Sequence, residues 1–203
     1  MQQPNSKETS AQNILAQAEK HFQAGQLSQA ENLLRGLLKT QPNNADALFA
    51  LGLIAYAARK LDAAIELIEE AIEVNPKAAR FHTNIAAMYG EKGDLQQSIE
   101  HGRVAVTLRP ELSEPHNNLG VAYLNSGDTS SAAEHFTRAI ALDASNSDAL
   151  INRANGFIKQ RKFAEAEADA RQAIGVSPQK VGGYNSLASA LIAKPARDRK
   201  SVV

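Results

Sequence analysis

The 203-residue chain contains no cysteine and no tryptophan, and only 5% of its residues are aromatic. The lack of cysteine excludes disulfide bonds and thiolate chemistry. Its 22 basic and 22 acidic residues cancel, so the charge balance favours neither nucleic acid nor an anionic membrane as a partner. No run of about 18 apolar residues is present to span a bilayer, and the polar N-terminus does not resemble a signal peptide. We therefore expect a soluble, cytoplasmic protein.

Catalytic and metal-binding motifs are also missing. The sequence has no Ser-His-Asp arrangement, phosphate-binding loop or glycine-rich fingerprint. His82 and His116 share one position of a repeat, as do His101 and His135, but no two histidines have the helical spacing that places two metal ligands on one face. We expect a protein that is not an enzyme and has no cofactor and no metal.

Four of the seven prolines, in contrast, recur at a fixed interval. Pro42, Pro76 and Pro110 are equally spaced, and Pro178 follows at twice that spacing, with Ala144 at the intermediate place. A strict period of about 34 residues is typical of stacked helical hairpins. It predicts an all-α solenoid, whose extended surfaces usually bind other proteins.

The period divides the chain into five repeats and a terminal helix. The predicted repeats are residues 11–44, 45–78, 79–112, 113–146 and 147–180, followed by a capping helix at 181–193 that should present a polar outer face. Residues 1–10 are predicted to form a flexible tail, and residues 194–203 a basic, disordered tail.

Small side chains recur at two positions of every repeat. The eighth position holds Ala18, Gly52, Ala86, Gly120 and Ala154, and the twentieth holds Ala30, Ala64, Ser98, Ala132 and Ala166. We expect these residues to let the two helices of each hairpin approach closely.

Residues at the predicted helix ends indicate turns and caps. Gly25, Gly93 and Gly127 lie between the two helices of their repeats, where a left-handed residue is expected. Ser28 with Glu31 predicts a capping box, and Ser113 predicts an N-cap.

These features together resemble the tetratricopeptide repeat (TPR) family. The resemblance also includes the aromatic residues at the eleventh position, Tyr89, Tyr123 and Phe157, and the alanines at position 27, Ala71, Ala105, Ala139 and Ala173. It implies a right-handed α-solenoid of five TPR hairpins plus a C-terminal capping helix. It also implies that the first helix of each hairpin lines a concave groove that binds partners. Gly102 and Arg153 depart from the family pattern, which has large apolar residues at their positions, and predict locally looser packing.

Asparagines recur at the sixth position of three successive repeats. Asn84, Asn118 and Asn152 are separated by the same interval as the prolines, and asparagine is a poor helix former. Because an amide both donates and accepts hydrogen bonds, the three could hold the backbone of an extended peptide. They resemble the asparagine ladder in the TPR superhelix of O-GlcNAc transferase. The alternative is inheritance by repeat duplication, without a binding role.

Neighbouring positions extend this predicted groove. Asn117, Asn155 and Lys159 should share the face of the asparagines, and toward the N-terminus it becomes apolar at Phe49, Leu53 and Tyr56. The apolar residues are either a pocket for partner side chains or core between repeats, and both interpretations stay open at this point.

The sequence therefore predicts a non-catalytic protein–protein interaction scaffold that binds an extended protein or peptide segment in its concave groove. A second hypothesis is the substrate-recognition TPR arm of a glycosyltransferase-type enzyme, acting in cis within a longer chain or in trans. The initial methionine and the predicted capping helix favour a self-contained protein. A third interpretation is self-association through the solenoid ends.

Overall fold

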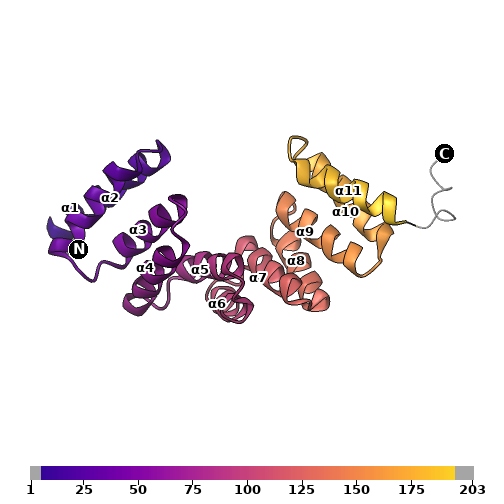
Figure 1. Cartoon of the computed structure of the whole chain (residues 1–203), viewed down its shortest axis with the longest axis horizontal. Coiled ribbons are helices and arrows are strands. Elements are labelled where there is room, and N and C mark those ends of the chain that lie inside the picture. The colour runs from indigo at the N-terminus through magenta and orange to yellow at the C-terminus, as the bar shows by residue number, and fades with distance from the viewer. Residues whose placement is uncertain (1–5, 195–203) are drawn as a thin grey trace. The chain divides into compact units, whose positions relative to one another are not determined.

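The structure is a computed structural model that describes residues 6–194. Eleven α-helices and no strands form the described part of the chain (Figure 1). In chain order they are α1 (Ser6–Gln23), α2 (Leu27–Thr40), α3 (Ala45–Ala57), α4 (Leu61–Val74), α5 (Ala79–Lys92), α6 (Leu95–Leu108), α7 (Ser113–Ser126), α8 (Thr129–Leu142), α9 (Ser147–Lys159), α10 (Phe163–Val176) and α11 (Val181–Ala193).

The helix boundaries follow the predicted register. First helices begin at residues 45, 79, 113, 147 and 181, and second helices at residues 27, 61, 95, 129 and 163, so both series advance by the interval of the prolines. This confirms the prediction of five hairpins and a terminal helix. The first helix differs, because α1 already begins at Ser6, ahead of residue 11. Residues 1–5 and 195–203 of the two predicted tails lie outside the described residues.

The array divides into two compact units within α5. Unit 1 ends at Met88 and unit 2 begins at Tyr89. Inside each unit the helices of a hairpin pack on each other. Successive first helices also touch, α1 with α3 in unit 1, and α7 with α9 and α9 with α11 in unit 2. The first helices therefore form one continuous layer within a unit. The handedness of the solenoid stays a prediction.

The recurring small residues form the helix crossings, as predicted. A Cβ atom added at Gly52 would lie 2.6 Å from Ile68 Cγ1, and one added at Gly120 would lie 2.6 Å from the Phe136 ring. The alanines at the eighth and twentieth positions of the five repeats are buried. Close approach of two helices needs small side chains at the contact, and these positions supply them.

The loops between the two helices of a hairpin contain a left-handed residue. Gly25, Gly93 and Gly127 have positive φ as predicted, but Arg59 and Arg161 adopt φ of 61° at the same place in the second and fifth repeats. Only glycine enters this region without a steric penalty. Two of the five hairpins therefore have a strained turn.

Both predictions of serine caps were wrong. The N-cap of α2 is Gln26, whose side chain makes no capping hydrogen bond, so Ser28 lies inside the helix. Ser113 is the first residue of α7, and its hydroxyl donates to the Ala139 carbonyl at 2.8 Å. The observed capping side chains belong to Asn44, Asp94, Asp128 and Asn146. Amide and carboxylate oxygens, and not the predicted serine hydroxyls, thus accept the hydrogen bonds from the first backbone N–H groups of these helices.

The prediction of loose packing at Gly102 and Arg153 was also wrong. Leu119 fills the space above Gly102, where an added Cβ would lie 3.0 Å from the leucine Cδ1. Arg153 donates two hydrogen bonds of 2.7 Å to the buried carboxylate of Asp169, and a third of 3.0 Å to Thr137. A bidentate ion pair thus links α9 to α10 where the family pattern has an apolar contact.

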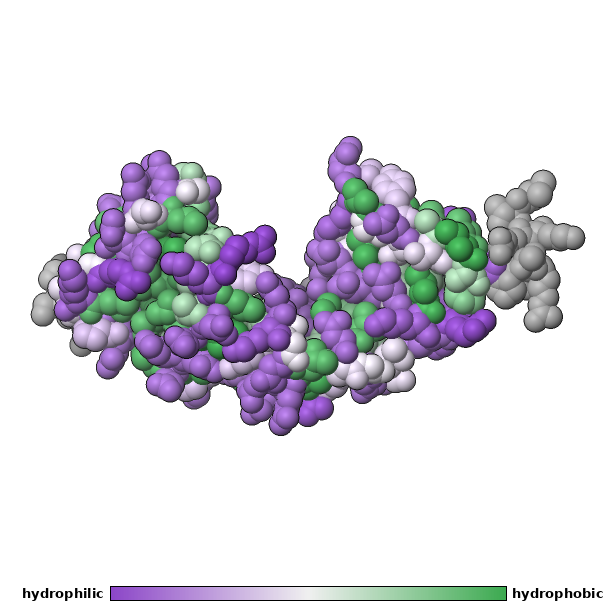
Figure 2. Space-filling model, viewed as in Figure 1, coloured by the Kyte–Doolittle hydropathy of each residue, from purple (hydrophilic) through white to green (hydrophobic). Residues whose placement is uncertain are grey.

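The last described helix, α11, has an apolar outer face instead of the predicted polar one. Four of its large apolar side chains are exposed, those of Val181, Tyr184, Leu191 and Ile192. Within residues 6–194, no further helix follows α11 to cover this face. Figure 2 shows hydrophobic residues at the surface over α10 and α11. Self-association through the ends of the array stays a prediction. None of the helices in the described range is long and apolar enough to cross a membrane.

Candidate functional site

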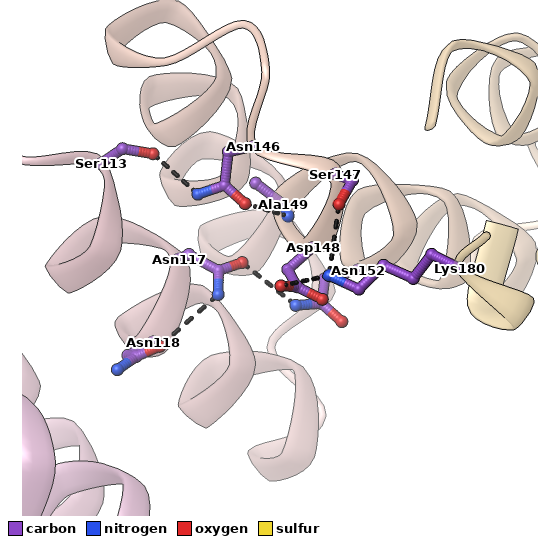
Figure 3. A network of polar contacts seen from close by, with 9 residues as sticks. All are labelled: Ser113, Asn117, Asn118, Asn146, Ser147, Asp148, Ala149, Asn152 and Lys180. Carbon is purple, nitrogen blue, oxygen red and sulfur yellow. Dashed lines mark hydrogen bonds and ion pairs between the residues drawn. The ribbon is translucent and has the colours of Figure 1, made fainter. Parts of the chain in front are cut away.

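A polar cluster lies on the first-helix layer of unit 2, on α7 and α9 (Figure 3). The Asn152 Nδ2 amide donates a 3.0 Å hydrogen bond to Asn117 Oδ1 in the preceding repeat. The Asn117 Nδ2 amide in turn points at Asn118 Oδ1, 3.5 Å away. The structure thus brings together three of the predicted site residues, and we call this set, Asn117, Asn118 and Asn152, the asparagine cluster.

A network of side chains beside the cluster positions α9. The Asn146 amide caps this helix by accepting from Ala149 N at 2.9 Å, and it donates to the Ser113 hydroxyl, also at 2.9 Å. On the other side, the Lys180 ammonium group bonds Ser147 and Asp148 (Figure 3). These contacts link the start of α9 to Ser113 at the start of α7 and to Lys180, the residue before α11, so the backbone that carries Asn152 is held on both sides.

The asparagine cluster offers both kinds of hydrogen-bonding group to a ligand. Asn152 Oδ1 and Asn118 Nδ2 have no hydrogen-bond partner among residues 6–194, whereas the other amide atom of each side chain contacts Asn117. Both side chains are half-buried. An oriented acceptor and an oriented donor match the alternating N–H and C=O groups of a peptide backbone.

The predicted contacts at Asn155 and Lys159 lie near the C-terminal end of α9. Asn155 Oδ1 accepts a 2.8 Å hydrogen bond from Ser186 of α11. Lys159 Nζ is 3.4 Å from the Leu124 carbonyl oxygen and the side chain is exposed. Sequence reasoning missed Ser186. It is the sixth residue of the terminal helix α11, which is the position of Asn84, Asn118 and Asn152 in their repeats, so a serine hydroxyl follows the three asparagine amides.

Asn84, the remaining asparagine of the column, lies in unit 1. Its Nδ2 amide donates to the Arg80 carbonyl of its own helix at 2.8 Å, and its Oδ1 has no partner in the described range. The Arg80 guanidinium pairs with Asp46 and lies 5.2 Å from the ring centroids of both Phe49 and Phe81. Asn84 is therefore held by local contacts different from those of the unit 2 asparagines.

The three apolar candidates of unit 1 differ in exposure. Phe49 is only 7% exposed and stacks on Phe81 with 4.6 Å between ring centroids, which places it in the core between two repeats. Leu53 is half-buried, and Tyr56 is 39% exposed. Of the two interpretations that the sequence left open, burial favours core for Phe49 and leaves Leu53 and Tyr56 as surface candidates.

The paired histidines of the fourth repeat contact each other. His116 Nε2 lies 3.2 Å from the Pro110 carbonyl, which can only accept, so this nitrogen carries the proton. His116 Nδ1 then accepts from His135 Nδ1 at 3.1 Å. Burial lowers the pKa of both side chains below the usual value for histidine. Among the residues described, no group of three His, Cys, Asp or Glu side chains could hold a metal ion.

Comparison with known families identifies the repeats. The sequence profile of the tetratricopeptide repeat matches residues 15–73, 50–113 and 117–180, which is most of the chain. The chain belongs to the tetratricopeptide-repeat family. Stacked tetratricopeptide repeats form extended surfaces for protein–protein interaction, and this agrees with the fold.

Individual relatives are similar to parts of the chain or to its fold. A UDP-N-acetylglucosamine–peptide N-acetylglucosaminyltransferase of Caenorhabditis elegans is 31% identical over 81 residues, which is 40% of this chain and 7% of that protein. The probable enzyme SEC of Arabidopsis thaliana is 30% identical over 87 residues, 43% of this chain and 9% of that protein. This tetratricopeptide-repeat chain thus matches less than a tenth of the length of either relative.

Solved structures show the same fold at low sequence identity. Pseudomonas aeruginosa pilF superposes with a TM-score of 0.81 at 20% identity, covering 93% of this chain and 91% of that one. YrrB, described as a TPR protein with an unusual peptide-binding site, superposes with a TM-score of 0.70 at 14% identity, covering 90% and 97%.

Proposed function

We propose that the protein is a non-catalytic interaction scaffold that binds an extended peptide segment of a partner on the first-helix layer of unit 2. The observation that carries this proposal is the asparagine cluster. Asn118 Nδ2 would donate to a carbonyl of the peptide, and Asn152 Oδ1 would accept from one of its N–H groups. Because Asn117 already orients both amides, less side-chain freedom is lost on binding than from mobile side chains.

The other predicted site residues would add contacts to the bound peptide and so affect which peptides are preferred. Asn155 Nδ2 and the Lys159 ammonium group lie on α9, toward its C-terminal end, and would select for carbonyl or carboxylate groups of the peptide. In unit 1, Leu53 and Tyr56 form a separate apolar contact region for partner side chains. Asn84 offers one acceptor there, Oδ1.

Peptide selection followed by substitution tests the proposal. Peptides selected from a random display library on the wild-type chain are measured against the double variant Asn118→Ala, Asn152→Ala. Each lost hydrogen bond should weaken binding about 3- to 10-fold, whereas thermal stability should change little because alanine is the better helix former. Asn32→Ala, an exposed asparagine on the second helix α2, is the matched control and should bind like wild type.

A backbone change in the peptide distinguishes backbone recognition from side-chain recognition. An ester placed at successive amides of a selected peptide removes one N–H at a time. One ester should weaken binding to wild type but not to Asn152→Ala. The proposal fails if the double variant binds every selected peptide like wild type, or if it loses helicity to an extent that shows a structural role.

The similarity to peptide N-acetylglucosaminyltransferases favours a second candidate, a substrate-recognition array for such an enzyme. The matched segments cover 40% and 43% of this chain and are confined to a small part of those proteins. Reading the gene beyond the codon for Val203 tests action in cis, and a catalytic domain there would support it. For action in trans, adding the chain to a purified transferase should change which proteins it modifies.

A further inference from the structure

A surface pocket of about 160 Å³ lies in unit 1 between α2, α3 and α4. Its walls are mostly small or aliphatic side chains with charged groups at the rim. The lining residues are Glu31, Arg35, Leu51, Ile54, Ala55, Ala58, Lys60, Ala63 and Leu67. An apolar cavity of about 150 Å³ is large enough to bind benzene, so the pocket can accept one aromatic ring.

The repeat register explains why this space exists. The eleventh position holds Tyr89, Tyr123 and Phe157 in the third, fourth and fifth repeats, but Ala55 in the second. Tyr89 is 8% exposed and Tyr123 is 9% exposed, so both rings are buried within their repeats. Ala55 lacks the ring, and the pocket lies against this alanine.

The fourth repeat shows how a ring is held at this position. The Tyr123 ring stacks on His135 with 5.6 Å between centroids, and its hydroxyl accepts a 2.9 Å hydrogen bond from Arg103 Nε in the preceding repeat. The Arg103 guanidinium also lies 5.7 Å from the ring centroid. The phenol group of Tyr123 is thus held by the imidazole ring of His135 and the guanidinium group of Arg103.

The pocket has the same three positions, with alanine in place of the tyrosine, leucine in place of the histidine, and the arginine retained. Ala55, Leu67 and Arg35 occupy the positions that Tyr123, His135 and Arg103 hold two repeats later in the chain. All three line the pocket. Arg35 Nε presently donates to Glu31 at 2.8 Å across an exposed surface, with arginine and glutamate side chains 64% and 40% exposed. Because an ion pair so exposed to water contributes little stability, Arg35 can leave Glu31 and bond another acceptor at small cost.

We propose that this pocket is a second binding site, which takes the side chain of a tyrosine presented by a partner protein. The ring lies between Ala55 and Leu67, and the phenol oxygen accepts a hydrogen bond from Arg35 Nε. The site does not depend on the asparagine cluster, so either can be correct without the other. Tyrosine is preferred over phenylalanine because only its hydroxyl can use the arginine at the rim.

The first test uses p-cresol, the side-chain analogue of tyrosine, with toluene as the analogue that lacks the hydroxyl. Both are titrated into the full chain carrying methyl-labelled alanine, leucine and isoleucine, and the chemical shifts are followed by NMR. Ala55, Ala58, Ala63 and Leu67 methyl signals should move with p-cresol and saturate at millimolar concentration. Toluene should bind about 3- to 10-fold more weakly.

Two substitutions locate the site and the hydrogen bond. Ala55→Tyr places a covalently attached phenol ring in the pocket, at the position that Tyr123 has in the fourth repeat, so it should raise the melting temperature and abolish p-cresol binding. Ala63→Leu narrows the pocket from α4 and provides a second blocked variant if Ala55→Tyr loses helicity. Arg35→Gln should remove the preference for p-cresol over toluene, and Lys39→Gln on the same helix is the control that should keep it.

Three results would overturn the proposal. The first is the absence of shifts at the pocket methyl groups up to the solubility limit of p-cresol. The second is unchanged p-cresol binding in both blocked variants. The third is equal affinity for toluene and p-cresol in the wild-type chain, which would mean an apolar pocket without tyrosine recognition. N-acetyl-tyrosinamide should reproduce the p-cresol shifts, whereas N-acetyl-alaninamide should not.

Discussion

At the scale of single residues, the arginines in the hairpin turns are the clearest departure from ideal geometry. Arg161 has φ of 61°, and the structure gives it no contact that requires an arginine. Arg161→Gly should stabilise the protein by about 0.5–1 kcal/mol, because removal of the left-handed penalty exceeds the extra entropy of glycine in the unfolded chain. Urea denaturation measures the change.

The control for this substitution is an arginine with ordinary helical geometry. Arg138 is exposed within α8, so Arg138→Gly should destabilise the protein by about 1 kcal/mol. If both glycine variants lose stability, the left-handed turn at residue 161 is not strained.

The glycines within helices differ in whether there is space for an added methyl group. At Gly120 a Cβ would lie 2.6–3.1 Å from three atoms of the Phe136 ring, whereas at Gly36 it would meet nothing within 4 Å. Gly120→Ala should therefore cost about 1–3 kcal/mol through overpacking. Gly36→Ala should stabilise the protein by up to about 1 kcal/mol through helix propensity. Opposite signs in thermal denaturation are expected, and a stabilised Gly120→Ala variant would contradict the close crossing.

At the scale of helices, the Arg153–Asp169 pair joins α9 to α10. The two side chains are 18% and 7% exposed, so removing one partner leaves a nearly buried charge. Asp169→Ala should cost about 3–5 kcal/mol. The double variant Arg153→Leu, Asp169→Leu should regain most of that loss, because an apolar pair removes both charges. Chemical denaturation of the single and double variants tests this, and equal losses in both would contradict it.

The His116–His135 contact between α7 and α8 makes stability depend on pH. Burial lowers the pKa of both residues, and for His135 the charge of His116 lowers it further. Arg103 and Arg138 act in the same direction, whereas Glu134 opposes it for His135. The unfolded chain, with histidine pKa near ~6.5, therefore binds protons first as the pH falls, and protonation favours unfolding.

We expect stability to be full above about pH 7, to decline below about pH 6.5, and to level off once the pH passes below the folded pKa values. Urea denaturation at several pH values measures the decline. The variant His116→Gln, His135→Gln should show a shallower dependence over this range. An unchanged slope would mean that other groups cause it.

At the scale of the whole molecule, the division into two units predicts local unfolding. Tyr123 belongs to unit 2, is 9% exposed and packs against Leu119 and Phe136. Tyr123→Ala should cost about 3–5 kcal/mol through the cavity it leaves. Because repeats are stabilised mainly by their neighbours, amide hydrogen exchange should accelerate in unit 2 and stay slow in unit 1. A cost below about 1 kcal/mol would contradict the assigned register.

The repeat architecture could be predicted from the amino acids alone, because each hairpin is closed by residues close together in the chain. The spacing of Pro42, Pro76 and Pro110 and the small residues Gly52 and Gly120 sufficed to predict the hairpins and their crossings. The asparagine column was likewise visible, since a fixed period places equivalent residues on equivalent helices. In unit 2 the folded chain brings Asn117, Asn118 and Asn152 together.

The side chains that compensate for departures from the pattern could be identified only in the folded chain, because their contacts join residues distant in sequence. Packing placed Phe49 in the core against Phe81 and paired Arg153 with Asp169. It also left a pocket beside Arg35, where Ala55 lacks a ring. The repeat register shows that Ala55 stands where three other repeats have an aromatic residue. Whether neighbouring side chains fill the space left by the ring depends on packing among α2, α3 and α4, which only the folded chain shows.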